Sequence, residues 1–240
     1  MEEKSLLSDK AILRHIEKKT IVISPFFRQN LSTSSYDVTL GPYYYREVEP
    51  EPCHSLYNPY SESMVKKIWG EYHQAELVKD WSNRTGMKLE NIRDDDYIIF
   101  IRPGETILGH TNEFIGGQET VTTMMKARSS LGRNFIEVCK CAGWGDVGYV
   151  NRWTMEITNN SKHYSIPLVV GRRIAQIIFF DTEGIEGPSY ESSGKYQSSN
   201  DIESLKKEWS PQCMLPKMYK DKEITCKVPA FSFDNYNFNK

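Results

Sequence analysis

No uninterrupted apolar run in the sequence reaches the ~18 residues that a membrane-spanning helix needs. Residues 1–4 lack the basic-then-apolar layout of a secretory signal. Lys and Arg number 30 and Asp and Glu number 32, so the net charge of −2 supplies no basic field that would attract nucleic acid. The five cysteines are odd in number and scattered, which disfavours a disulfide scaffold. We therefore expect a cytoplasmic protein with neither a membrane nor nucleic acid as its partner.

Apolar and aromatic residues are frequent enough to build a core. Hydrophobic residues make up 39% of the chain and aromatic residues 12%, which suits a sheet-rich protein. In the second half of the chain, short apolar or alternating runs are separated by Gly, Pro, Asn and Asp, without a long helix between them. These runs predict strands at 97–101, 106–110, 120–125, 136–141, 152–158, 164–170 and 173–180. The pattern predicts an all-β sandwich or barrel and argues against a parallel α/β sheet.

The remaining segments differ in character from this β region. Residues 5–19 predict one short helix, which Ser8 can cap. The segment 46–96 is broken by prolines, and we expect it to be an insertion that is helical over part of its length. We expect residues 1–200 to form a single domain and residues 201–240 to form a C-terminal extension or arm.

Two arginines and two hydroxyl groups lie close together directly after a predicted strand. These residues are Arg128, Ser129, Ser130 and Arg133. Serines after a strand can open a helical turn whose free N–H groups face an anion, and arginine adds bidentate phosphate contacts. The segment is therefore either a phosphate-binding site or a polar turn with solvated arginines.

Three glycines within six residues mark the segment 142–149. They predict a tight hairpin with close backbone approach. Asp146 is its only carboxylate, and Tyr149 can lie flat against a sugar or a base. An ordinary hairpin with a packed tyrosine is the alternative interpretation.

A glutamate lies in the middle of the predicted strand 152–158. Alternation places Trp153, Met155 and Ile157 on one face and Glu156 on the other. Glu156 therefore faces either solvent or a pocket. In a pocket, burial would raise its pKa toward neutrality and make it suitable for proton transfer.

In this order, the three segments resemble the dCTP deaminases, a family within the trimeric dUTPase superfamily. Further segments that support the resemblance are SYDVTLG at 35–41, GRRIAQ at 171–176 and GKYQ at 194–197. The spacing from Arg133 to Asp146 and to Glu156 also fits the family without a gap. The hairpin that begins at Ala142 is more similar to the dUMP-forming members than to those that only deaminate.

The resemblance implies a distorted jelly-roll or barrel-like β fold, a homotrimer, and active sites that take residues from neighbouring subunits. It implies hydrolysis of dCTP to dUTP and ammonia and, in some members, a further step to dUMP and diphosphate. Mg²⁺ accompanies the triphosphate, and no catalytic zinc is implied. The His-x-Glu and Pro-Cys-x-x-Cys patterns of zinc deaminases do not occur in the sequence. Cys139 and Cys141 are expected to share one face of a strand, without a second ligand pair.

The resemblance also implies a role for each candidate residue. Glu156 matches the catalytic glutamate, which takes a proton from the attacking water and returns protons to the base and the leaving amine. A backbone carbonyl near Ala142, together with Ser129 and Arg133, is expected to orient that water. The implied substrate contacts are Arg128, Ser129, Ser130 and Arg133 for the phosphates, Asp146 and Tyr149 for the deoxyribose, Thr154 and Met155 for the base edge, and Gln176, Tyr190, Lys195 and Gln197 for closing the triphosphate site.

Two alternative functions stay open. A dUTPase needs the anion-binding segment and Asp146 but has no use for Glu156, because that strand position is apolar in typical trimeric dUTPases. A catalytically inactive nucleotide-binding or regulatory protein of the same fold is the other alternative. The insertion 46–96 motivates it, as does Ser199, which stands where the family often has a glutamine. Gly145 also departs from the family pattern, which usually has a branched aliphatic residue before the aspartate.

Overall fold

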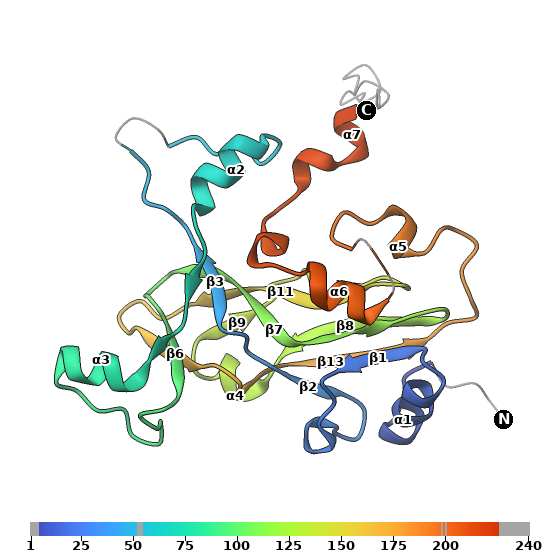
Figure 1. Cartoon of the computed structure of the whole chain (residues 1–240), viewed down its shortest axis with the longest axis horizontal. Coiled ribbons are helices and arrows are strands. Elements are labelled where there is room, and N and C mark those ends of the chain that lie inside the picture. Colours follow the sequence, from blue (N-terminus) through green and yellow to red (C-terminus); the bar gives the residue numbers. More distant parts are fainter. Residues whose placement is uncertain (1–4, 52–54, 198, 200, 226–240) are drawn as a thin grey trace, which may run out of the picture.

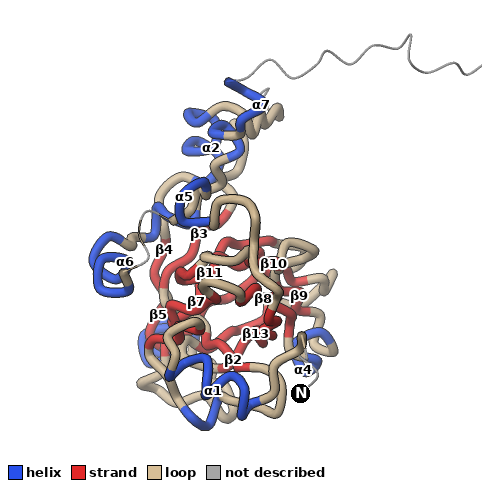
Figure 2. Tube along the Cα trace, turned by 90° about the vertical axis from the view of Figure 1, so that its right-hand side faces the viewer, coloured by secondary structure: helices blue, strands red, loops and turns tan. Residues whose placement is uncertain are grey.

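The computed structural model describes residues 5–51, 55–197, 199 and 201–225. These residues form a sheet-rich body with helices around it, as Figures 1 and 2 show. The α-helices are α1 (Asp9–Glu17), α2 (Glu62–Trp69), α3 (Val78–Thr85), α4 (Ser129–Gly132), α5 (Tyr190–Ser193), α6 (Ile202–Glu208) and α7 (Lys222–Thr225), and the 3₁₀ helices are η1 (Arg28–Asn30), η2 (Pro211–Met214) and η3 (Met218–Lys220). The strands are β1 (Ile21–Ser24), β2 (Tyr36–Thr39), β3 (Tyr43–Arg46), β4 (His73–Gln74), β5 (Glu76–Leu77), β6 (Tyr97–Ile101), β7 (Thr106–Gly117), β8 (Val121–Ala127), β9 (Ile136–Val138), β10 (Trp144–Gly145), β11 (Val150–Asn159), β12 (Ile166–Val169) and β13 (Arg173–Asp181).

The strands form three antiparallel sheets. The largest has the order β4-β3-β7-β11-β9, with β1 added to β7, and the second has the order β10-β8-β13-β2. A small third sheet joins β12, β6 and β5. The predicted sheet-rich class is confirmed, and in the described part of the chain the sheets stay open rather than closing into a barrel.

The two larger sheets share one hydrophobic core. Strand β11 shows how alternation builds it, because Trp153, Met155 and Ile157 are all buried in the core while Thr154 and Glu156 are only half-buried. The Trp153 indole also donates to the Ile115 carbonyl of β7 at 2.9 Å. Core packing therefore fixes which side chains of β11 can face a cavity.

Two predictions about local structure differ from the observed chain. Ser8 occupies the N-cap position of α1, but its side chain makes no capping hydrogen bond. Strand β9 ends at Val138, because Cys139 and Lys140 have positive φ angles of 62° and 42° that break the extended backbone. The expectation that Cys139 and Cys141 share a strand face is therefore wrong, and Cys139 is buried while Cys141 is exposed.

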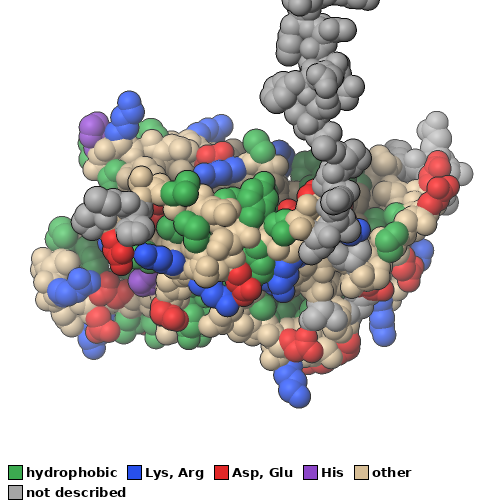
Figure 3. Space-filling model, turned by 90° about the horizontal axis from the view of Figure 1, so that it is seen from above, with side chains coloured by type: hydrophobic (Ala, Val, Ile, Leu, Met, Phe, Trp, Pro, Cys, Tyr) green, Lys and Arg blue, Asp and Glu red, His purple; other side chains and the backbone are tan. Residues whose placement is uncertain are grey.

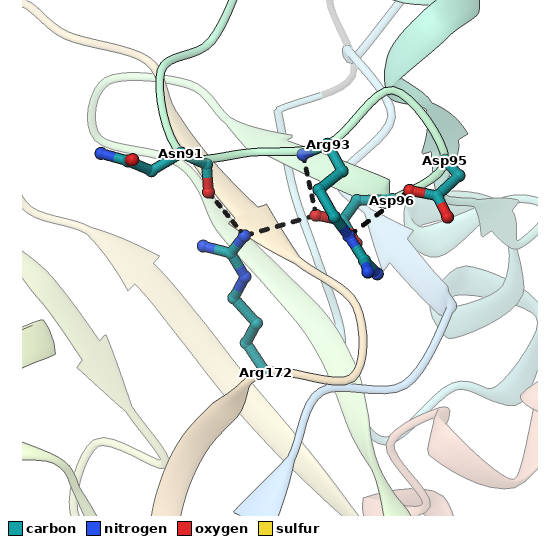
Figure 4. A network of polar contacts seen from close by, with 5 residues as sticks. All are labelled: Asn91, Arg93, Asp95, Asp96 and Arg172. Carbon is teal, nitrogen blue, oxygen red and sulfur yellow. Dashed lines mark hydrogen bonds and ion pairs between the residues drawn. The ribbon is translucent and has the colours of Figure 1, made fainter.

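The insertion 46–96 extends two of the sheets. Its strand β4 pairs with β3, its strand β5 pairs with β6, and these strands divide its helical part into α2 and α3. A polar network ties its end to the main body (Figure 4), because Arg172 donates to the Asn91 carbonyl at 2.9 Å and pairs with Asp96 at 3.3 Å. Arg93 pairs with the same aspartate at 3.0 Å.

The C-terminal segment 201–225 packs on the largest sheet through its residues 202–215. Leu205 and Met214 are each 3% exposed, and they contact side chains of β7 and its neighbouring strands. The Trp209 ring lies 4.6 Å from the His110 ring, centroid to centroid. Residues 202–215 are therefore docked on the sheet through apolar and aromatic side chains.

His110 is a fully buried titratable group on β7. Its Nδ1 lies 2.8 Å from the Thr111 carbonyl and its Nε2 accepts from the Tyr43 N–H at 3.3 Å, which fits the neutral tautomer protonated at Nδ1. Burial lowers its pKa from 6.5 to about 4. A lowered pKa stabilises the fold above pH 6.5, and that contribution is lost as the pH falls toward 4.

We expect the free energy of unfolding to fall by about 2 kcal/mol between pH 7.5 and pH 5 through His110 alone. Urea unfolding of the wild type and of His110→Gln across this range measures that contribution as the difference between the two pH profiles. Because other titrating groups are common to both proteins, parallel profiles would show that His110 does not titrate in this way.

Candidate active site

A cavity of about 340 Å³ lies between β11, the hairpin that contains β10, and two C-terminal segments. The residues predicted from the sequence that line it are Ala142, Asp146, Tyr149, Thr154, Glu156 and Tyr190. The other lining residues are Leu108, Trp144, Gly145, Asn151, Arg152, Trp153, Tyr196, Cys213, Met214 and Pro216. The fold therefore gathers residues of two predicted segments, 142–149 and 152–158, together with Tyr190 around one space.

Glu156 places its carboxyl group at this cavity. Its neighbours Met155 and Ile157 are 0% exposed in the core, so alternation directs Glu156 to the cavity side of β11. The Cys139 N–H donates to the Glu156 carbonyl at 3.0 Å and fixes the strand there. Burial raises the pKa of the carboxyl group above its ordinary value of 4.5, and the charge of Lys140 opposes this rise. The pKa of the carboxyl group is thereby moved in the direction of neutral pH, which favours a role in proton transfer.

Close packing explains the glycines that precede Asp146. A Cβ on Gly143 would lie 2.3 Å from the Met125 carbonyl oxygen, and a Cβ on Gly145 would lie 2.4 Å from the Thr123 hydroxyl. A branched residue therefore does not fit at position 145, which accounts for the departure from the family pattern. The tight hairpin leaves Asp146 exposed at the edge of the cavity.

Aromatic rings form another wall of the cavity. The Tyr149 ring meets Tyr190 and Trp153 edge to face, with centroid distances of 4.9 Å and 5.2 Å. The Tyr190 N–H donates to the Val147 carbonyl at 3.0 Å and holds α5 against the hairpin. The Tyr149 ring, which is predicted to contact the sugar, therefore lies at the cavity and is held in place by Tyr190 and Trp153.

The predicted phosphate-binding segment lies elsewhere on the chain. Ser129, Ser130 and Arg133 are exposed on and next to α4, and none of them lines the Glu156 cavity. Arg128 turns toward the buried Asp37, with its Nε 3.7 Å from the carboxylate. Within one chain, therefore, the four residues predicted to bind phosphate do not lie at the same cavity as Glu156.

The residues predicted to close the triphosphate site have internal partners. Gln176 donates to the Ser35 hydroxyl at 3.4 Å. Lys195 pairs with Asp221 of the C-terminal segment. Gln197 is buried and accepts from the Val150 N–H at 2.7 Å. Their proposed contact with a substrate stays a prediction.

A second cavity, of about 1010 Å³, is lined by four arginines. They are Arg128, Arg152, Arg172 and Arg173. Arg173 pairs with Asp37 at 3.0 Å, and Arg172 belongs to the network that holds the insertion. Arg152 lines this cavity and the Glu156 cavity alike, so the two spaces meet at its side chain.

The sequence reasoning missed Arg152 and the C-terminal part of the cavity wall. Alternation along β11 places Arg152, Thr154 and Glu156 on the same face, and this signal could have identified the arginine. The backbone register shifts between Arg152 and Thr154, which bends the strand at this point. Cys213 and Met214 come from a segment without hydrophobic periodicity, so no sequence pattern places them at the cavity.

Within the described ranges, no group of three or more His, Cys, Asp or Glu side chains is arranged to hold a metal ion. No helix in those same ranges has the length and apolarity that a bilayer crossing demands. Acidic, basic and apolar side chains are interspersed over the face seen from above (Figure 3).

The fold and the cavity define the class as a sheet-rich protein whose candidate site combines a carboxyl group of raised pKa with aromatic walls. The family model described as dCTP deaminase-like matches residues 6–182. The chain belongs to this family.

Curated relatives and a solved structure are similar to the chain. The dUMP-forming dCTP deaminase of Hydrogenobaculum sp. (strain Y04AAS1) is 32% identical over 176 residues, which cover 72% of this chain and 81% of the relative. The dUMP-forming dCTP deaminase of Methanocaldococcus jannaschii is 31% identical over 175 residues, covering 72% and 81%. The structure of 2′-deoxycytidine 5′-triphosphate deaminase from Agrobacterium tumefaciens has a TM-score of 0.49 and 16% identity, and the match covers 74% of this chain and 48% of that one.

Proposed function

We propose that the protein hydrolyses the 4-amino group of dCTP and then the triphosphate, giving ammonia, dUMP and diphosphate without a catalytic zinc. The observation that carries this proposal is the Glu156 carboxyl group in a cavity that also contains Asp146 and Tyr149. The two curated relatives described above are dUMP-forming dCTP deaminases, which supports the second step. Each step consumes one water, so the balance is two waters for one ammonia and one diphosphate.

In the proposed first step, Glu156 acts as a general base and then as a general acid. Its ionised form takes a proton from the water that attacks C4 of cytosine, and its protonated form returns protons to N3 and the leaving amine. A raised pKa brings the protonated form of Glu156 closer to neutral pH than in a solvent-exposed glutamate, which suits a group that must both accept and donate protons. The Ala142 carbonyl, on the same cavity, is proposed to orient the attacking water.

The cavity also offers groups for the base and the sugar. Backbone groups of Thr154 and Met155 are proposed to read the base edge, because β11 runs along the cavity beside Glu156. Asp146 is proposed to accept from the deoxyribose 3′-hydroxyl, with the Tyr149 ring against the sugar. These contacts orient C4 toward Glu156, and orientation of this kind lowers the barrier by pre-arranging the reacting groups.

The phosphate contacts are proposed to come from a neighbouring subunit of a homotrimer. Ser129, Ser130 and Arg133 are exposed and do not line the cavity of their own chain, so they are free to face another copy.

Mg²⁺ is proposed to enter with the triphosphate, since it favours phosphate oxygens and water with few protein ligands. The cytoplasm is the proposed compartment.

The proposal is tested by incubating the protein with dCTP and Mg²⁺ and measuring ammonia, dUTP, dUMP and diphosphate together. We expect ammonia, dUMP and diphosphate in equal amounts. Ammonia with dUTP alone would limit the activity to deamination. Diphosphate from dUTP without ammonia from dCTP would favour a dUTPase, and nucleotide binding without products would favour a regulatory protein.

A further inference from the structure

Arg152 is a cation held between aromatic rings at the junction of the two cavities. Its guanidinium carbon lies 5.0 Å from the centre of the Phe114 ring and 4.6 Å from that of Trp209. Such stacking orients an arginine and partly compensates its charge. The side chain is thus fixed where the Glu156 cavity meets the arginine-lined cavity.

Arg152 has no ion-pair partner in the described part of the chain, and the Glu113 carboxyl group acts on its charge only from beyond ion-pair distance. Its Nε is buried without a hydrogen-bond partner there, and no carboxylate of those residues lies within ion-pair distance of its guanidinium. The other three arginines of the second cavity each pair with Asp37 or Asp96.

The buried carboxyl group of Glu113 does not form an ion pair with Arg152. Both oxygens of Glu113 are occupied by Thr39, whose N–H donates at 2.9 Å and whose hydroxyl donates at 2.8 Å. Burial raises the pKa of Glu113, and the charge of Arg152 opposes this rise, so the two groups interact without forming an ion pair. A half-buried cation without an ion-pair partner is costly, and an incoming anion would compensate it.

We propose that Arg152 binds a polyphosphate anion where the two cavities meet, and that Trp209 is a positioning residue that holds Arg152 for this contact. The planar guanidinium suits a phosphate oxygen pair, and the neighbouring arginines suit a ligand with several negative charges. The identification of that anion as the phosphate chain of dCTP, or as the diphosphate product, rests on the proposed function. The C-terminal segment thereby contributes to substrate recognition, through a residue that lies outside the family match at 6–182.

Titration calorimetry with inorganic triphosphate tests the anion contact without any catalysis. We expect Arg152→Gln to weaken binding by about 10-fold or more, the effect of losing one charge-assisted hydrogen bond. Arg84→Gln is the matched control, because Arg84 pairs with Glu76 in the insertion and lines neither cavity. Unchanged binding in Arg152→Gln, or no binding to the wild type, would overturn the proposal.

Steady-state kinetics then identify the source of the anion. With dCTP, Arg152→Gln should raise KM by about 10-fold while kcat stays within a few-fold, because the contact is remote from C4. With deoxycytidine, which has no phosphate, the two proteins should be equally slow. Weaker inhibition of the variant by inorganic diphosphate would assign the site to the product as well, and unchanged inhibition would assign it to the nucleotide alone.

The role of Trp209 is separated from simple stability by a pair of variants. Trp209→Phe keeps an aromatic face for Arg152 and should preserve the KM for dCTP, whereas Trp209→Leu should raise it as Arg152→Gln does. A fall in melting temperature with unchanged KM in Trp209→Leu would reject the positioning role. If the wild type releases no ammonia from dCTP but Arg152-dependent triphosphate binding remains, the proposed function fails and the anion site stands.

Discussion

Replacing Glu156 with glutamine should lower the rate of ammonia release from dCTP by ~10²–10⁴. Glutamine has nearly the same size and can still make hydrogen bonds in the cavity, but it cannot accept a proton from the attacking water. Because the substitution removes proton transfer rather than binding, the dissociation constant for dCTP should change little. Single-turnover ammonia release and calorimetric titration with dCTP measure the two effects separately.

Glu137→Gln provides the matched control for this experiment. Glu137 is also a half-buried glutamate, and it lies on β9, the strand that pairs with β11, but it does not line the cavity. We expect wild-type rates from this variant, since no substrate contact is removed. Wild-type ammonia release from Glu156→Gln would remove Glu156 from the mechanism, and equal losses in both variants would indicate damage to the sheet instead.

The alternation of apolar and polar residues allowed the sheet and its buried face to be predicted from the sequence. Along β11, Trp153, Met155 and Ile157 read as one apolar face, and the structure buries all three. The end of β9 was not predictable, because Cys139 and Lys140 adopt positive φ without the glycine that usually marks such a backbone. Strand existence follows from local pattern, whereas strand ends depend on how neighbouring segments pack.

The candidate site was predictable only where short-range spacing determines it. Asp146 and Glu156 come together because the hairpin runs directly into β11, so their separation along the chain fixes their approach. Met214 and Trp209 reach the same region through contacts between segments far apart in sequence, which single-sequence patterns do not encode. Arg152 was visible in the alternation, but its function depends on the aromatic rings that surround it.

The second large effect is expected from Gly116→Ala, at the point where β7 pairs with β11. A Cβ on Gly116 would lie 1.9 Å from the Tyr149 carbonyl oxygen and 2.9 Å from the Val150 Cα. These are backbone atoms, which cannot rotate away as a flexible side chain can, so the two strands must separate. Overpacking of this kind should lower the free energy of unfolding by about 3 kcal/mol. For a chain of this length, the melting temperature should fall by roughly 6–12 °C.

The same substitution should also impair catalysis, because the displaced carbonyl belongs to Tyr149, the residue that joins the hairpin to β11. Gly187→Ala is the control, since a Cβ there meets no atom within 4 Å and the backbone is not left-handed. Thermal unfolding and ammonia release are measured for both variants. A wild-type melting temperature in Gly116→Ala would contradict the close approach of β7 and β11, whereas a lower melting temperature with full activity would show that the cavity tolerates their separation. A lower melting temperature together with lost ammonia release in Gly116→Ala, while Gly187→Ala is unaffected, would show that Gly116 is needed for the geometry that places Asp146 near Glu156.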